Sequence, residues 1–295
     1  MPGEAPRASV LTLVRGRAAQ VRNLMRGLSA QSVRPRELVI AWMQPEPASD
    51  LPDPGCPVRD LHVQGEPMPL AAARNRAAET AAGDALIFLD VDCVPGPTLV
   101  EAYAAACVQT EGLFLGEVLY LPPDAVALEP QGGIDYARLD RLGRVHPAKP
   151  AVPAAGLRRE PDPSQLWGLS FALAAGAWRE AGGMDEGFSG YGAEETDLAQ
   201  RLAGGGLSTY WTAGARAYHQ HHPVHVPPLQ HFDTILANAA RFRARHGRWC
   251  MGYWLGQFRD AGLIAWDEDA PAIRVLRRPG PDAVAASLRP DALFS

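Results

Sequence analysis

The sequence predicts an α/β protein with a Rossmann-like mixed sheet flanked by helices, followed by a C-terminal helical extension. Short apolar runs alternate with segments of helical periodicity over the first 110 residues, which is typical of parallel strands joined by helices. One of these runs ends in Asp90 and Asp92, and ligands collect at this edge of such sheets. After Pro228, apolar residues recur at the spacing of one helix face.

Length and composition place the chain among ordinary globular proteins. It has 295 residues, of which 47% are hydrophobic and 21% charged, and this excludes a mostly disordered or fibrous protein. The net charge is −5 and no basic block is present, so we expect no nucleic-acid partner. A packed domain of the size of an enzyme is the expected outcome.

Cysteine usage and hydropathy favour a cytoplasmic location. The four cysteines form no C-x-x-C pair, so reduced thiols are expected rather than disulfides or a zinc knuckle. No apolar run approaches the roughly 18 residues of a membrane-spanning helix. A location at the inner face of the membrane stays open, because an amphipathic helix needs only one apolar face to attach there.

The first half of the chain is expected to alternate strands and helices, with the strands paired in parallel. The apolar run 9–14 is the first strand, and apolar residues at helical spacing follow it. Further strands are predicted at 37–42, more weakly at 60–63, and at 85–89. A helix over 70–82 begins after Pro69 and ends at Gly83, both typical positions for these residues.

The second half is predicted to interrupt this alternation. A strand over 113–121 precedes a segment, 122–165, that is rich in proline and charge and shows no sustained periodicity. We expect this segment to form a long loop or lid. A strand at 169–174, a helix at 194–203 and a short strand at 215–219 then complete a domain that spans 1–225.

Beyond this domain the sequence predicts a helical extension over 226–270 and a tail over 271–295. The apolar residues at helical spacing in its first helix are Leu229, Phe232, Ile235, Leu236, Ala239 and Phe242. Residues 249–258 supply aromatic side chains for a second helix. Packing against the domain is the favoured role of the apolar face. A homodimer contact and a membrane surface stay open, and Arg241, Arg243 and Arg245 would suit the membrane surface.

The strand at 85–89 delivers two carboxylates, Asp90 and Asp92, to the loop at its C-terminal end. Carboxylates placed in this way can hold Mg²⁺ or Mn²⁺, which in turn would neutralise a nucleotide diphosphate. The alternative is that the two aspartates are solvated turn residues.

A second acidic cluster opens the predicted helix 194–203. Glu194, Glu195 and Asp197 follow a glycine-rich segment, and the helix dipole favours anions at this position. A carboxylate beside a sugar can accept the proton of an attacking hydroxyl. The alternative is a cluster that only stabilises the start of the helix.

Five of the eight histidines lie within thirteen residues, from His219 to His231. An imidazole can complete the coordination of a cation that Asp92 already holds, and His219, at the end of a predicted strand, is best placed for it. His221 is the second choice, and His222 stays open. A histidine cluster without metal and an independent zinc site are the alternatives. No H-E-x-x-H helix accompanies the cluster to support the zinc site.

Together these motifs resemble the inverting glycosyltransferases of family 2 with the GT-A fold, in particular those with a galactosyltransferase-like C-terminal half. Residues 70–77 are similar to the segment of that family that lies on the nucleotide sugar, and residues 90–92 to its metal-binding D-x-D signature. Residues 182–186 with 190–197 resemble its acceptor and catalytic segment. The resemblance covers about residues 8–225, with a nucleotide-sugar half at 8–120 and an acceptor half at 165–225.

The resemblance implies a donor site and a metal site. Arg74 would face the nucleotide diphosphate, and Asn75 and Arg15 would complete the donor site. Asp92 would bind the cation, Mn²⁺ or Mg²⁺, directly, and His219 would supply a later metal ligand. Asp90 would contact the ribose or take part in metal binding.

The resemblance also implies the acceptor and catalytic residues. Glu195 matches the catalytic base, Glu194 matches the carboxylate that orients the acceptor, and Asp197 is the fallback base. Trp167 and Gly168 resemble the aromatic residue and the glycine that line the acceptor pocket. An indole can pack against the apolar face of a sugar ring, although a tryptophan buried in the core is the alternative.

The implied reaction is the metal-dependent transfer of a sugar from a nucleotide-diphosphate donor to an acceptor hydroxyl with inversion. A UDP-sugar is the expected donor, but Trp42, Met43 and Gln44 stand where relatives carry an Asp-rich turn, so other bases stay open. The acceptor is a glycan, a lipid-linked molecule or a small molecule. The alternatives are a retaining enzyme of the same fold, a nucleotidyltransferase, and a catalytically silent module that binds a nucleotide sugar or glycan.

Overall fold

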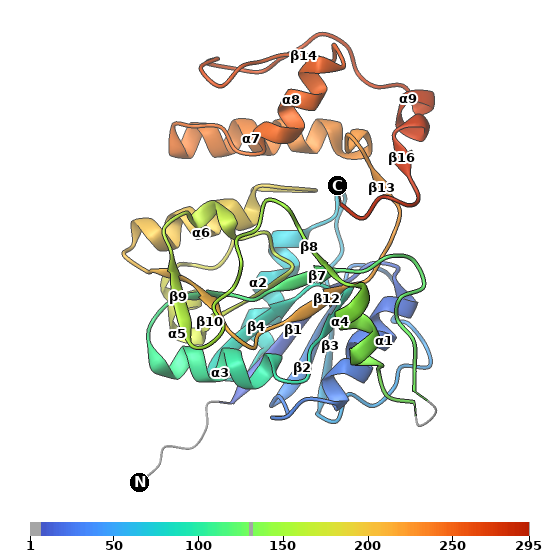
Figure 1. Ribbon diagram of the computed structural model, residues 1–295. Coiled ribbons are helices and arrows are strands. Elements are labelled where there is room, and N and C mark those ends of the chain that lie inside the picture. The colour runs from blue at the N-terminus through green and yellow to red at the C-terminus, as the bar shows by residue number, and fades with distance from the viewer. Residues whose placement is uncertain (1–6, 130–131, 295) are drawn as a thin grey trace.

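The computed structural model describes residues 7–129 and 132–294, and its centre is an eight-stranded mixed sheet (Figure 1). The strand order is β3-β2-β1-β4-β10-β6-β11-β9. The strands of this sheet are β1 (Ala8–Val14), β2 (Glu37–Trp42), β3 (Val58–His62), β4 (Ala85–Leu89), β6 (Leu113–Leu115), β9 (Leu157–Glu160), β10 (Ser170–Ala174) and β11 (Thr209–Thr212). Strands β1 to β4 pair in parallel as predicted, whereas β10 runs antiparallel to both β4 and β6. The prediction of a mixed sheet is therefore confirmed.

Helices cover both faces of this sheet. On one face lie α1 (Ala18–Ser29) and α3 (Leu99–Gln109), and on the other α2 (Leu70–Thr80), α5 (Ala175–Glu180) and α6 (Glu194–Gly204). The central strand β1 is buried along its whole length, with Val10 in one core and Leu11 in the other. A strand covered on both faces needs a mainly apolar run rather than alternation, and residues 8–14, which are apolar except for Ser9 and Thr12, supply it.

A smaller four-stranded sheet carries part of the site. Its order is β5-β12-β7-β8, made of β5 (Cys93–Pro95), β12 (Ala217–His219), β7 (Val118–Tyr120) and β8 (Arg144–Val145). The antiparallel register of β12 and β5 places His219 opposite Cys93. The pairing therefore brings the end of the histidine-rich segment beside the residue that follows Asp92.

Two predictions for the middle of the chain were wrong in detail. The single strand expected over 113–121 is two strands, β6 and β7, which belong to different sheets and are separated at Gly116 and Glu117. The segment 122–165 is not a featureless loop within its described residues, because it contains α4 (Tyr136–Leu142), β8, β9 and the short helix η1 (Pro163–Gln165). Helix α3 was not predicted at all.

The extension forms a compact unit with a core of its own. It contains β13 (Val224–His225), η2 (Leu229–His231), α7 (Phe232–His246), α8 (Gly252–Asp260), β14 (Ile264–Ala265), β15 (Arg274–Val275), α9 (Pro281–Ala286) and β16 (Leu288–Arg289). The last 25 residues were expected to form a tail. Instead, the backbone of residues 271–294 pairs with the extension: β15 pairs with β14, and β16 pairs with β13.

Helix α7 packs against the loop that precedes α6, and Figure 1 shows α7 and α8 lying above α6. Arg241 and Arg245 both bond to Asp185, and the amide of Asn238 donates to the carbonyl of Gly192 at 2.8 Å. Phe188 joins the apolar core of the extension. Of the three uses expected for the apolar face, packing on the domain is the one observed.

The arginines that suited a membrane surface are occupied by other partners. Arg241 and Arg245 face the acids of the domain, and the guanidinium of Arg243 lies 4.8 Å from the centroid of Trp249. Within residues 7–129 and 132–294, no helix combines the length and the hydropathy needed to cross a bilayer.

The close packing at Gly116 gives a prediction about stability. A Cβ atom at this position would overlap the carbonyl oxygen of Ala215 and the hydroxyl of Tyr103. We expect Gly116→Ala to lower the free energy of unfolding by about 1–3 kcal/mol, as overpacking does in cores. Gly176→Ala is the matched control, because a Cβ there meets no atom within 4 Å and should stabilise helix α5 by up to about 1 kcal/mol. Equal midpoints for the two variants in urea would contradict this account.

Candidate active site

Backbone pairing gathers the site at the C-terminal end of β4. Asp90 and Asp92 lie in the short connection from β4 to β5. The amide of Asp90 donates to the carbonyl of Leu169 at 3.0 Å, and the amide of Gln220 donates to the carbonyl of Asp92 at 2.6 Å. Segments that lie far apart in the sequence are thus fixed around one loop, at the edge where ligands of α/β sheets collect.

Asp92, His219 and His222 form a group that can hold a metal ion, with one ligand atom of each residue within 4.8 Å of the others. The Nε2 atoms of His219 and His222 lie 3.6 Å and 3.4 Å from the carboxylate of Asp92. The Nδ1 of His222 donates to the carbonyl of Pro223 at 3.0 Å, which leaves the lone pair on Nε2 for a metal. Asp92 Oδ1 is buried and has no hydrogen-bond partner. These residues therefore fit a first-row divalent cation such as Mn²⁺.

The protonation of this group suits metal binding. Burial opposes ionisation of Asp92, but His219, His222 and Arg17 outweigh it and hold the pKa of the carboxyl well below its usual range. Burial lowers the pKa of His219. A carboxylate and a neutral imidazole are the forms that coordinate metals.

Two metal-site predictions change in detail. His222 joins Asp92 and His219, whereas His221, the second choice from the sequence, is not in the group. Asp90 is also outside this group, and its Oδ1 accepts a hydrogen bond from Arg74 at 3.3 Å. The sequence could not distinguish the neighbouring histidines, since the chain leaves β12 without a period that would indicate which ring turns inward.

Arg74 is the centre of the acidic side of the site. Its side chain is 4% exposed, and its guanidinium lies 3.2 Å from Glu194, 3.0 Å from Glu195 and 3.3 Å from Asp90. Three carboxylates thus surround one cation contributed by α2. Arg74 was expected to face the donor diphosphate, and in the structure its guanidinium contacts these acids.

Glu194 and Glu195 differ in their surroundings although they are adjacent in the first turn of α6. The side chain of Glu194 is 2% exposed, and burial, together with the charge of Glu195, raises its pKa to about 8. The side chain of Glu195 is 15% exposed and lies against Gly168, where any side chain would overlap Glu195 Oε1. At neutral pH Glu194 is mainly protonated, and Glu195 is the member of the pair that a ligand can reach.

Burial also raises the pKa of Asp90, to about 7, against the attraction of Arg74. Asp92 and Glu195 add to the increase because they are negative charges nearby. The cluster around Arg74 therefore contains a carboxyl group with a pKa of about 7.

Asp197, the fallback base, has both oxygens occupied. It is completely buried and accepts hydrogen bonds from Arg201 at 2.8 Å, from Arg245 at 2.8 Å and from His246 at 2.9 Å. Burial opposes its ionisation, but these donors lower its pKa. This arrangement suits a residue that anchors α7 to α6 rather than one that accepts a proton from a substrate.

The two remaining donor-site predictions fall on residues with protein partners. The amide of Asn75 donates to the carbonyl of Met184 and to Glu186, each at 2.9 Å, and its oxygen accepts from the amide of Met184 at 2.8 Å. Arg15 forms an ion pair with Glu66 on an exposed loop. Arg17, which the sequence analysis did not select, lies 3.7 Å from Asp92. Its position directly before α1, after a strand that enters the site, is the signal that could have identified it.

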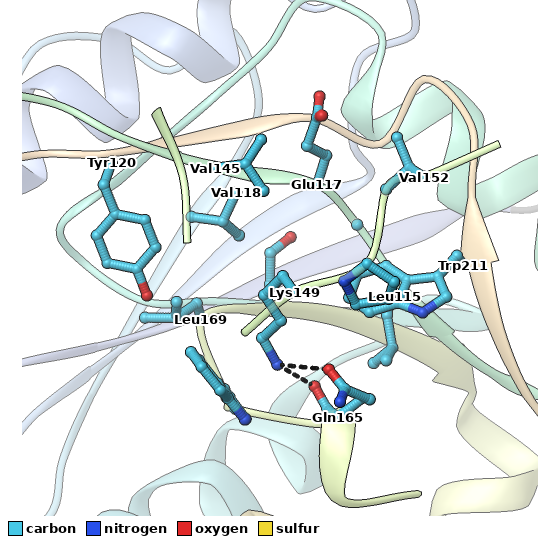
Figure 2. Close-up of a pocket in the computed structure, with 15 residues that line it drawn as sticks. Leu115, Glu117, Val118, Tyr120, Val145, Lys149, Val152, Gln165, Leu169 and Trp211 are labelled. Carbon is cyan, nitrogen blue, oxygen red and sulfur yellow. Dashed lines mark hydrogen bonds between the residues drawn. The ribbon is translucent and has the colours of Figure 1, made fainter. Parts of the chain in front are cut away.

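Trp167 is not a core tryptophan, because 38% of it is exposed at a pocket. Figure 2 shows Lys149 extending through this pocket towards Gln165, whose carbonyl oxygen accepts its hydrogen bond at 2.6 Å. The Nζ atom of Lys149 lies 3.4 Å from the centroid of Trp167, and burial lowers the pKa of Lys149 to about 6. Gly168 also lines the pocket, so the pocket borders Glu195.

Tyr120 connects this pocket to the metal-binding group. Its ring lies 4.8 Å from the ring of His219 and 5.7 Å from that of His146, and it lines the pocket in Figure 2. The ring of Phe294 meets Tyr120 at 5.0 Å, edge to face. Sequence patterns could not identify Tyr120, Lys149 or Phe294, because each enters the site through tertiary contacts only.

The geometry predicts which histidines matter for Mn²⁺. His222→Ala removes one of three ligands and should weaken Mn²⁺ binding at least about tenfold. His221→Ala, one residue away, should change the affinity less than about twofold, since its ring is outside the group. Calorimetric titration with Mn²⁺ measures both, and equal losses in the two variants would refute the ligand set.

The burial of Glu194 predicts that its replacement by the neutral isostere glutamine stabilises the protein to an extent that depends on pH. Between the ordinary pKa of 4.5 and the folded value of about 8, the folded state keeps a proton that the unfolded state has lost. Wild-type stability therefore falls as the pH rises through this window, by at most about 1.4 kcal/mol per pH unit from this group.

We expect the stability of Glu194→Gln relative to wild type to increase from pH 5 to pH 8 and then level off. Urea unfolding at each pH measures this difference. Glu180→Gln, at an exposed carboxylate, is the matched control. A difference for Glu194→Gln that is constant over this range would show that Glu194 is ionised in the folded protein.

Comparisons with known proteins bear on the fold and on one segment of the chain. Residues 154–224 match the model of a family described as the N-terminal domain of galactosyltransferase. This match covers β9, the Trp167–Gly168 turn, the acidic first turn of α6 and the histidines that follow β12. A search of curated protein sequences finds no match.

Solved structures share the fold at low sequence identity. A crystal structure of GalNAc-T7 with UDP, GalNAc and Mn²⁺ superposes with a TM-score of 0.54 at 16% identity, over 74% of this chain and 43% of that one. A structure of residues 1–349 of TarS from S. aureus gives a TM-score of 0.53 at 13% identity, over 80% of this chain and 65% of that one. The chain thus spans less than two thirds of each. The protein has the GT-A glycosyltransferase fold, with a segment of the galactosyltransferase type at residues 154–224.

Proposed function

We propose that the protein is a metal-dependent glycosyltransferase that moves a sugar from a nucleoside-diphosphate donor to an acceptor hydroxyl with inversion. The observation that carries the proposal is the convergence of two groups on one site. The Asp92, His219 and His222 group and the Glu194 and Glu195 pair are linked through Asp90 and Arg74.

The metal group defines the donor side of the site. Asp92, His219 and His222 would hold Mn²⁺, which supplies positive charge for the departing diphosphate. The GalNAc-T7 structure contains UDP and Mn²⁺ together, and this supports a UDP-sugar as the donor. Asp90 lies between this group and Arg74 and faces the donor side.

Glu195 is the proposed base. It takes the proton of the acceptor hydroxyl, the oxygen of that hydroxyl attacks the anomeric carbon, and the bond from that carbon to the diphosphate oxygen breaks with its electron pair. Arg74, at 3.0 Å, fixes the position of Glu195. Protonated Glu194 cannot compete for the proton, and it can donate a hydrogen bond within the site.

The pocket beside Trp167 is the proposed acceptor site. The exposed part of the indole offers an apolar face, and Gly168 lets the acceptor approach Glu195. Within the pocket, the Nζ atom of Lys149 lies 3.4 Å from the ring centroid of Trp167. This lining suits a sugar ring or another acceptor with one apolar face and a reactive hydroxyl, whether free, glycan-bound or lipid-linked.

Substitution of the base tests the reaction. We expect Glu195→Gln to lower the turnover of a UDP-sugar by about 10²–10⁴-fold, because general base catalysis is lost. Calorimetric affinity for UDP with Mn²⁺ should stay within about twofold of wild type, since the metal group is unchanged. A variant with normal turnover would refute the role of Glu195, and UDP binding without transfer or donor hydrolysis in the wild type would indicate a silent binding module.

Glu180→Gln is the control, because its carboxylate is exposed outside the site, and it should keep wild-type turnover. The anomeric configuration of the product, read by NMR, decides the stereochemistry. A product that keeps the configuration of the donor sugar would contradict inversion while leaving the transferase assignment in place.

A further inference from the structure

We propose that Arg17, and not Arg74, is the arginine that binds the diphosphate of the donor; this inference rests on the function proposed above. It assigns the phosphate-binding role to a residue at the start of α1. The ligand class is a nucleoside diphosphate bound together with a divalent cation.

Arg74 is already committed to other anions. Both terminal nitrogens of its guanidinium lie within 3.3 Å of a carboxylate oxygen, and three acids share this cation. With only 4% of the Arg74 side chain exposed, a diphosphate could reach it only by displacing Asp90, whose side chain is 32% exposed, or one of the more buried glutamates. Leaving a buried carboxylate without its partner costs more than the new contact would return.

Arg17 has the opposite character. Its Nη1 atom is buried and has no hydrogen-bond partner, and it lies 3.7 Å from Asp92 Oδ2, beyond hydrogen-bond distance. The Nη1 atom is covered by protein, while the side chain as a whole is 33% exposed, so an anion can approach the guanidinium from its solvent side. A guanidinium N–H that is desolvated beside a metal-binding carboxylate, yet makes no hydrogen bond, is available for an incoming anion.

The backbone of Arg17 indicates that this placement is imposed by the fold. Its φ is 60° and ψ 34°, a left-handed conformation that a residue with a long side chain rarely adopts. Arg17 directly precedes α1, and its own side chain makes no capping hydrogen bond to that helix. Such outliers persist where the surrounding structure demands them, and here the result is a guanidinium beside Asp92.

The charges of the donor side define the ligand. When Asp92, His219 and His222 hold a divalent cation, the only negative charge in that group is the carboxylate of Asp92. Arg17 adds another positive charge at the same carboxylate. The excess of about two positive charges matches the charge of a bound diphosphate, whereas the acids around Arg74 leave no positive excess there.

Calorimetry with UDP and with Mn²⁺ on the full chain tests this assignment. Arg17→Ala should weaken UDP binding at saturating Mn²⁺ by about tenfold or more, the effect of a lost charge-assisted hydrogen bond. The same variant should bind Mn²⁺ alone as tightly as wild type or more tightly, because a positive charge beside Asp92 has been removed. A merely structural role would weaken both.

Two further variants make the result decisive. Arg17→Gly removes the same charge but accepts the left-handed backbone without strain, so it should match Arg17→Ala in UDP affinity while keeping or raising the melting temperature. Arg22→Ala removes another arginine of α1, one that bonds to the carbonyls of Ser49 and Asp50, and should leave UDP affinity within twofold of wild type.

The outcomes separate this inference from the proposed function. If both Arg17 variants bind UDP with the affinity of the wild type, the role of Arg17 is overturned and the transferase proposal stands. A parallel loss of UDP and Mn²⁺ affinity would also overturn it. If the wild type binds neither UDP, GDP nor TDP in the presence of Mn²⁺, the proposed function fails, and this inference fails with it.

Discussion

The site depends on one buried interaction, the contact of the Arg74 guanidinium with the carboxyl groups of Asp90, Glu194 and Glu195. Three acids in a space with little water would repel one another, and burying a charge without a partner is costly. Arg74 offsets part of this repulsion, and a proton on Glu194 offsets more of it. One cation thus holds two adjacent glutamates in different surroundings, since the side chain of Glu194 is 2% exposed and that of Glu195 15%.

The second constraint is the way two sheets meet at the end of β4. The antiparallel strand β10 brings Gly168 and Leu169 to Asp90, and β12 of the smaller sheet brings His219 to Asp92. Both contacts depend on backbone pairing, so they hold the acidic and the imidazole groups at fixed positions. Tyr120, on the strand beside β12, then packs against His219 and lines the pocket at Trp167.

Sequence reasoning identified those site residues that local patterns mark. An apolar strand ending in Asp90 and Asp92, and acids in the first turn of a helix, are visible without a structure, and both lie where the pattern placed them. Tertiary contacts could not be predicted from these patterns. Examples are the proximity of His222, rather than His221, to Asp92 and the hydrogen bond between Asn75 and Met184. Gly116 was missed as a strand boundary because its contacts with Ala215 and Tyr103, which exclude a side chain there, are made through space. The ordered segment after residue 270 was missed because its short strands have no periodicity of their own.

The network around Asp197 makes the two parts of the molecule inseparable in practice. Helix α6 presents Glu194 and Glu195 at its first turn. Two residues after Glu195, Asp197 accepts hydrogen bonds from Arg245 and His246 of α7. A shortened chain that ended before α7 would keep every proposed catalytic side chain and still lose two of the three donors to that carboxylate. Attempts to build a shorter unit with the same site would have to replace Asp197 with a neutral residue as well, and chimeras that exchange the extension between related proteins would have to carry both halves of this contact.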